Sequence, residues 1–194
     1  HAGDPGWKVG GGPADGTTNP DRGRVHLGCG AGQYETLGNP GTRAGQQSVA
    51  IGFQAGHIAM SQDAVAVGRQ SGFYLQGPQS VAIGAESGLT EQGALATAVG
   101  YQAGQTFQGT LATAVGYQAG QQGQSQGAVA VGSDAGNRDQ GLRAVAVGED
   151  AGKTAQGDYA IAVGKDAGYT SQGLNGIAIG YDAASNSQSA NAIA

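Results

Sequence analysis

The chain has 194 residues, of which 39 are glycine, and its aromatic content is only 6%. It has 9 basic and 14 acidic residues, a formal net charge of −5 and no basic cluster, which argues against binding to nucleic acid or to an anionic membrane surface. A single cysteine excludes a disulfide framework within the chain, and no apolar run approaches the roughly 18 residues of a membrane-spanning helix.

The first 47 residues differ from the rest of the chain. Residues 1–24 are rich in Gly, Pro and Asp and show no strand pattern, so we expect an irregular amino-terminal arm or cap. Val-His-Leu-Gly at 25–28 has the phase of the later repeats, but the next equivalent glycine, Gly52, follows only after an insertion around residues 37–45. We therefore expect residues 25–47 to form a degenerate first coil with an enlarged loop, as terminal repeats that shield a sheet edge often do.

From residue 48 to residue 194 the chain has a strict period. One glycine returns every sixteen residues, at Gly52, Gly68, Gly84, Gly100, Gly116, Gly132, Gly148, Gly164 and Gly180. A period of this length is typical of a solenoid, in which each coil packs only against its neighbours. The sequence predicts an all-β solenoid of nine coils over 48–194. Residues 192–194 stop in the phase of a strand, which indicates a piece of a longer fibre.

A short strand precedes each of these glycines, as in Ala-Val-Ala-Val at 64–67. Alternate side chains of a strand point to opposite faces, so the two large aliphatic positions share one face, which we expect to fill the coil interior. The position between them is alanine in all nine coils: Ala50, Ala66, Ala82, Ala98, Ala114, Ala130, Ala146, Ala162 and Ala178. A solvated face normally carries polar residues. The alanine file therefore predicts a seam against another chain; the alternative is a small, neutral surface residue.

The second half of each coil contains a turn and a glutamine. Gln-Ala-Gly at 54–56 and its equivalents predict a tight turn that leads into a second short strand. Glutamine then recurs at Gln76, Gln92, Gln108, Gln124, Gln140, Gln156, Gln172 and Gln188. We expect these amides to hydrogen-bond to one another or to cap turn backbone, and the alternative is an exposed polar turn residue.

The string Ser-Val-Ala-Ile-Gly occurs at 48–52 and 80–84, with close variants in the other seven coils. It resembles the head repeat of trimeric autotransporter adhesins, the YadA-like head, and similar repeats occur in phage and giant-virus fibre proteins. The resemblance covers 48–194. It implies a left-handed parallel β-roll that forms a homotrimer, is extracellular on a bacterial surface or a virion or phage fibre, and serves adhesion. The regular Gln-Ala-Gly turn and Gln-Gly half-coil are closer to the viral and phage relatives.

No pattern in the sequence indicates an enzyme or a cofactor. The three histidines, His1, His26 and His57, stand at no fixed spacing from a nucleophile or carboxylate. Asp134, Asp150, Asp166 and Asp182 form a single row, whereas a glycosidase needs two carboxylates that face each other. We expect no metal site in the chain. His26 occupies the alanine slot, and only if that file lines a threefold axis would three copies converge there and bind a metal or anion. The alternative is a capping histidine.

The candidate binding residues are aromatic side chains at variable positions of the repeat, which stack on sugar rings or contact a protein receptor. They are Phe53, Phe73, Tyr74, Tyr101, Phe107, Tyr117, Tyr169 and Tyr181. The alternative is packing against neighbouring coils or chains. The leading hypothesis is an adhesion or receptor-binding fibre segment whose partner is a host surface protein or glycan. The alternatives are a structural spacer that presents a distal tip and an ice-binding solenoid.

Overall fold

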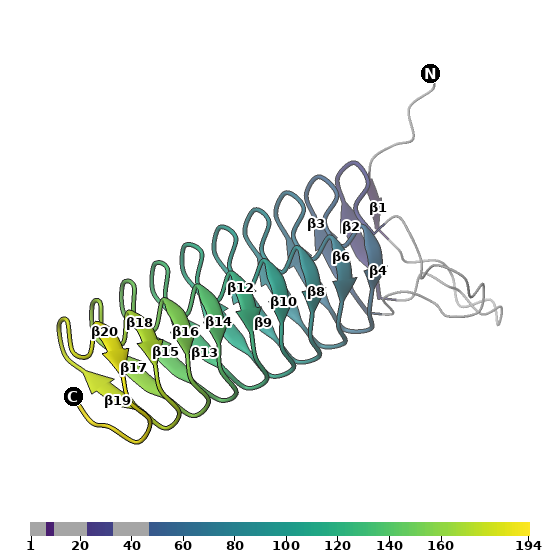
Figure 1. Ribbon diagram of the computed structural model, residues 1–194. Coiled ribbons are helices and arrows are strands. Elements are labelled where there is room, and N and C mark those ends of the chain that lie inside the picture. Colours follow the sequence, from purple (N-terminus) through teal and green to yellow (C-terminus); the bar gives the residue numbers. More distant parts are fainter. Residues whose placement is uncertain (1–6, 10–22, 33–46) are drawn as a thin grey trace.

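The computed structural model describes residues 7–9, 23–32 and 47–194, and in this part of the chain all regular structure is β. Figure 1 shows a rod of stacked coils that runs from the amino-terminal end to the carboxy-terminal end. From residue 48 on, each coil contributes one three-residue strand to each of two sheets. The sequence-based prediction of an all-β solenoid is confirmed, and none of the described segments is a helix long and apolar enough to cross a membrane.

The first sheet has 11 strands and contains the Val-Ala-Val segments. From β3 on, neighbouring strands of this sheet pair in parallel and in register, so that residues sixteen apart face each other, as Ala66 faces Ala82. The strands are β1 (Trp7–Val9), β2 (Val25–Leu27), β3 (Val49–Ile51), β5 (Val65–Val67), β7 (Val81–Ile83), β9 (Thr97–Val99), β11 (Thr113–Val115), β13 (Val129–Val131), β15 (Val145–Val147), β17 (Ile161–Val163) and β19 (Ile177–Ile179). We call it sheet A.

The second sheet, sheet B, has nine parallel strands and contains the glutamine file. Its strands are β4 (Ile58–Met60), β6 (Tyr74–Gln76), β8 (Thr90–Gln92), β10 (Thr106–Gln108), β12 (Gln122–Gln124), β14 (Arg138–Gln140), β16 (Thr154–Gln156), β18 (Thr170–Gln172) and β20 (Asn186–Gln188). The predicted turn and second strand of each coil are thus present. In the middle of each sheet B strand except β12, a non-glycine residue has positive φ.

The amino-terminal segment differs in part from the expectation. Residues 7–9, placed by the sequence in an irregular arm, form β1, which pairs antiparallel with β2 and covers that edge of sheet A. β2 pairs in register with β3, so that His26 lies beside Ala50. The expected inserted loop around residues 37–45 lies outside the described residues.

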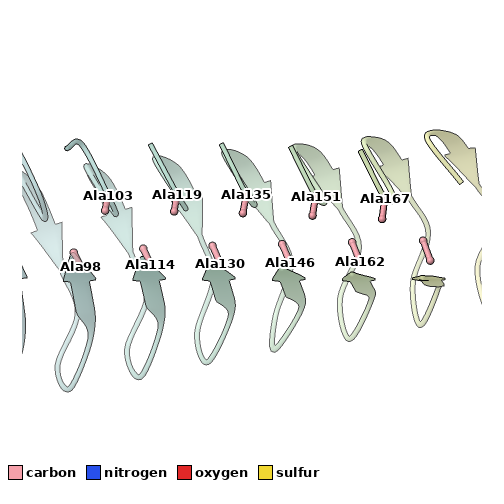
Figure 2. Close-up of a cluster of buried hydrophobic side chains, with 11 residues drawn as sticks. Ala98, Ala103, Ala114, Ala119, Ala130, Ala135, Ala146, Ala151, Ala162 and Ala167 are labelled. Atoms are coloured by element: carbon pink, nitrogen blue, oxygen red, sulfur yellow. The ribbon is translucent and has the colours of Figure 1, made fainter. Parts of the chain in front are cut away.

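The faces of sheet A are reversed relative to the prediction. Every alanine of the predicted seam is fully buried within the single chain, where the file faces a second alanine file from the turn after each closing glycine. Figure 2 shows the two files pointing toward each other, with Ala98 below Ala103 and Ala114 below Ala119. An alanine that is inaccessible in one chain cannot form a seam with another. The Val and Ile side chains, expected inside, lie half-buried or exposed on the outer face instead.

The reason for this reversal is the width of the coil. Sixteen residues enclose two short strands back to back, and the space between them holds alanines from both sides together with one glutamine per coil. Interiors are close-packed, so a larger β-branched side chain in the alanine position would push the sheets apart. Where serine replaces an inner alanine, its hydroxyl is satisfied locally, as Ser71 Oγ donates to the Gly68 carbonyl at 3.2 Å.

The glutamine file forms the predicted ladder inside the coil. From Gln92 to Gln172, each Nε2 donates to Oε1 of the glutamine sixteen residues later, for example from Gln108 to Gln124 at 3.1 Å. The same Nε2 group also donates to a strand carbonyl of sheet A, as Gln108 does to Thr97 at 2.8 Å. The ladder therefore joins the two sheets and the successive coils.

The periodic glycines have a steric cause. Gly132 has φ of +132°, and a Cβ there would lie 2.5 Å from the carbonyl oxygen of Gly148 in the next coil. The coils come so close at this position that no side chain fits between their backbones.

We expect Gly132→Ala to destabilise the protein more than Gly180→Ala, which has a similar φ of +125° but no atom closer to the new Cβ than 4.0 Å. The difference should be about 1–3 kcal/mol, the typical cost of overpacking. Chemical denaturation of both variants measures it. Equal losses would show that φ alone, and not coil contact, requires the glycine.

The ladder has a defect at its amino-terminal end. Met60 is buried in the glutamine position and pairs with Gln76, whose buried Oε1 has no hydrogen-bond donor. We expect Met60→Gln to raise the free energy of unfolding by about 1 kcal/mol, because the new Nε2 would donate to this oxygen. Met60→Leu is the control for packing and should not stabilise. A destabilised Met60→Gln variant would contradict the prediction.

Candidate functional site

The candidate aromatic residues do not converge on one place. Four of them share the file that directly follows the closing glycine, and all four are exposed: Phe53, Tyr101, Tyr117 and Tyr181. Tyr101 and Tyr117 occupy adjacent coils, and their rings stack with centroids 5.5 Å apart and an interplanar angle of 17°. This pair is a direct consequence of the sixteen-residue period, which places equivalent side chains one strand spacing apart.

Two further candidates have packing partners within the chain. Phe73 stacks on His57 with ring centroids 5.1 Å apart. The ring of Tyr169 lies under Lys153 Nζ at 5.6 Å from the centroid, a cation–π contact. Both rings are half-buried, so they offer less surface to a partner than the first file does.

The last two candidates lie on sheet B. Tyr74 begins β6 and is half-buried, whereas Phe107, in the middle of β10, is 57% exposed. The sequence analysis missed other exposed large side chains: Leu75 on sheet B, and Leu95, Leu111, Tyr159 and Leu174 in the turn that leads into sheet A. Aligning the coils would have grouped Leu95, Leu111 and Tyr159 in one file, with Leu174 in the file before it. Exposure at that turn, however, depends on the packing of the roll.

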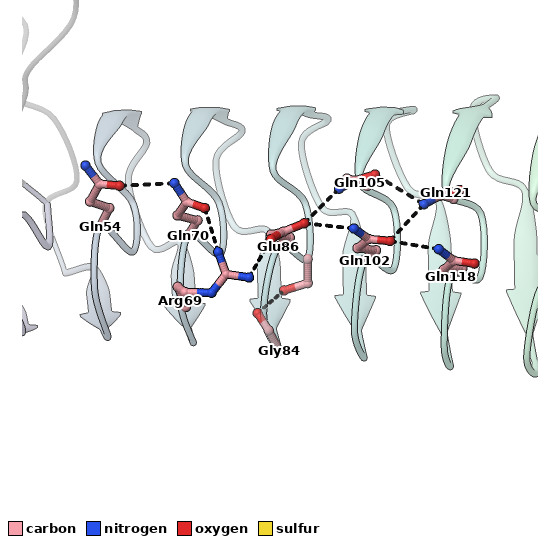
Figure 3. A network of polar contacts seen from close by, with 10 residues as sticks. Gln54, Arg69, Gln70, Gly84, Glu86, Gln102, Gln105, Gln118 and Gln121 are labelled. Carbon is pink, nitrogen blue, oxygen red and sulfur yellow. Dashed lines mark hydrogen bonds and ion pairs between the residues drawn. The ribbon is translucent and has the colours of Figure 1, made fainter.

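A polar network runs along the turn beside the first aromatic file (Figure 3). Gln118 Nε2 donates to Gln102 Oε1 at 2.8 Å, and Gln102 Nε2 donates to the Glu86 carboxylate at 2.8 Å. Gln105 also donates to this carboxylate, and Arg69 forms an ion pair with it at 2.5 Å. The amide donors therefore point toward Glu86.

The surroundings of Glu86 shift its titration. The hydrogen bond from Gln102, followed by the one from Arg69, lowers the pKa of the Glu86 carboxyl below its ordinary value, and partial burial opposes this only in part. In the carboxy-terminal coils acidic side chains take the place of these glutamines. There, Lys153 donates to Asp150 at 2.7 Å, which raises the pKa of the lysine.

Within the described part of the chain, histidine, cysteine and acidic side chains do not gather into a metal site. No group of three or more His, Cys, Asp or Glu residues in this part of the chain is placed to hold a metal ion. His26 Nε2 lies 3.4 Å from Ser48 Oγ, but Ser48 is fully buried, so no substrate can reach its oxygen. The ring of His26 occupies the space next to Gly32 inside its own coil, so the expected convergence of three His26 rings on a trimer axis is wrong.

Residues 48–194 thus form sixteen-residue coils with an interior of mostly alanine and glutamine and a short apolar strand closed by glycine. Residues 140–167 match the YadA head domain repeat, in two copies. These are YadA-like head repeats. No curated protein and no solved structure matches the chain. The coils on both sides of this matched pair have their strands in the same sheet order and keep the closing glycine at the same spacing.

A carboxylate whose pKa is lowered by folding stabilises the folded state at pH values above its ordinary pKa, here 4.5. The contribution of Glu86 to the free energy of unfolding should therefore be complete at neutral pH and lost as the pH falls below 4.5. We expect Glu86→Gln to cost about 1 kcal/mol at pH 7 and almost nothing at pH 2.5. Urea denaturation of both proteins at the two pH values measures this, and a pH-independent difference would contradict it.

Proposed function

We propose that this chain is a segment of an extracellular, non-catalytic adhesive fibre made of three parallel copies of a left-handed roll, on a bacterial surface or on a virion or phage fibre. The YadA-like head repeats support this proposal. A rod of in-register coils offers long faces rather than a pocket, and such faces suit attachment to a surface protein or glycan.

The observation that carries the assembly is the outer face of sheet A. Two files of β-branched side chains run along its length, and Ile83, Val131 and Ile179 are exposed in the single chain. A continuous apolar face of this kind marks an interaction surface. A second copy with the same period matches it coil for coil, so we assign the interchain seam to these Val, Ile and Thr residues instead of the alanines.

Light scattering after size exclusion tests the assembly. Three copies of the 19.0 kDa chain give about 57 kDa. We expect Val131→Lys, on the outer face of sheet A, to reduce this mass to that of a monomer, because a charge in an apolar seam is costly. Ser171→Lys, at an exposed position of sheet B, is the control and should remain a trimer. A wild-type monomer would contradict the proposal.

The adhesive function is tested by binding of the assembled protein to cultured animal cells, to bacterial cells and to a glycan array. Saturable binding to one of them supports an adhesin or a phage-type fibre, and the cell type separates the two. Absence of binding favours the alternative of a structural spacer that presents a distal tip. The small side chains Ala155, Ser171 and Ser187 on sheet B are consistent with that alternative.

Ice binding is the second alternative to adhesion, and the regular outward β-branched files, with Thr97 and Thr113, are the feature in its favour. It requires sheet A to be free in solution, so it is excluded if the protein is a trimer without thermal hysteresis.

A further inference from the structure

The middle residues of the sheet B strands form a file on the outside of the rod. Because the strands pair in register, Leu75, Glu91, Phe107, Gly123 and Asp139 follow one another along the rod, one in each coil. The next residue of each strand, the ladder glutamine, points inward and is buried. The file lies on the sheet opposite the apolar face of sheet A, so it stays accessible if sheet A is the interchain seam.

Two members of this file combine backbone strain with exposure. Phe107 and Leu75 both have φ of +55°, in the left-handed region that bulky side chains disfavour. Phe107 is 57% exposed and Leu75 is 40% exposed. Other coils hold Gly123, Ala155 or Ser171 at this position, residues that leave little apolar surface. Leu75 and Phe107 therefore place large apolar side chains on the outside of the rod at a left-handed position.

Carboxylates flank the phenyl ring along the same file. Glu91 lies between Leu75 and Phe107, and Asp139 lies beyond Gly123. Asp139 Oδ1 is 3.0 Å from the place that a Cβ of Gly123 would take, so this carboxylate covers the gap next to Phe107. None of the ion pairs among the described residues includes Glu91 or Asp139, nor the neighbouring exposed Arg138.

We propose that Leu75, Glu91, Phe107 and Asp139 form a docking site for a partner protein that presents a lysine or arginine beside an apolar side chain. This proposal rests on the adhesive function proposed above and names the chemistry of its partner. Leu75 and Phe107 are two strands apart, or about 10 Å, which leaves room for one basic side chain between two apolar contacts. That side chain pairs with a free carboxylate and lies against the phenyl face in a cation–π contact.

The decisive variant is Phe107→Gly. Gly123 shows that this file accepts glycine with the same backbone, so the change relieves strain, and we expect an unchanged or raised melting temperature. Ser171→Gly is the matched control, because Ser171 has the same place in its strand and φ of +50°. A role of Phe107 in folding alone would instead lower the melting temperature.

A random-peptide phage library is panned on the assembled wild-type protein and counter-selected on Phe107→Gly. We expect enriched peptides that carry a basic residue next to an apolar one. Their affinity should fall about tenfold or more for Phe107→Gly and for Glu91→Gln combined with Asp139→Asn, but not for Ser171→Gly. No enrichment, a consensus without a basic residue, or binding that survives Phe107→Gly would overturn the proposal.

Cell binding separates this site from the general function. If cells bind the wild type and Phe107→Gly equally, adhesion stands and the site is wrong. If the wild type binds no cells, the adhesive function fails, while the peptide selection still decides the site. Loss of Phe107-dependent binding after trypsin treatment of the cells supports a protein partner. Loss only after periodate oxidation would assign the site to a glycan and overturn the proposal.

Discussion

The narrow interior of the sixteen-residue coil determines the rest of this structure. Two three-residue strands lie back to back, and the space between them holds alanine, serine and one glutamine per coil, with Met60 in the glutamine position of the first regular coil. Close packing excludes larger side chains from that space. The valines and isoleucines of sheet A therefore point outward, although they are the most apolar residues of the repeat. In a single chain this arrangement leaves the strongest hydrophobic contribution unused.

Cohesion between coils comes from contacts that repeat in register. Inside the rod, glutamine amides donate toward the carboxy-terminal end, as from Gln92 to Gln108. On the surface, amides donate in the opposite direction, as from Gln118 to Gln102, and end at Glu86. Each coil thus contacts only its two neighbours, which makes stability a sum over interfaces. Departures concentrate in the first coils, where Met60 takes the glutamine position and the amide ladder begins only at Gln92.

Because the coils repeat in register, the outer faces of sheet A and sheet B differ in character along the whole rod. The outer face of sheet A is apolar along its length and suits a second copy of the chain, whereas sheet B is mostly small and polar, with Phe107 and Leu75 as exceptions. Single residues on sheet B can therefore vary without a change in the apolar face of sheet A. The backbone is left-handed at this position in every strand of sheet B, so a large side chain there adds exposure at a site already left-handed.

The sequence by itself determined the period, the strand before each closing glycine, the glutamine ladder and the placement of Tyr101 and Tyr117 in adjacent coils, because in-register coils turn sequence spacing directly into spatial neighbourhood. Alternation also showed which residues share a face of sheet A. It did not show which face is inside, since that depends on the distance between the sheets. Only the tertiary structure decided that Ala50 and its equivalents are core, that His26 points into its own coil, and that Phe107 is exposed at positive φ. Each of these follows from how closely the two sheets approach, which no local pattern encodes.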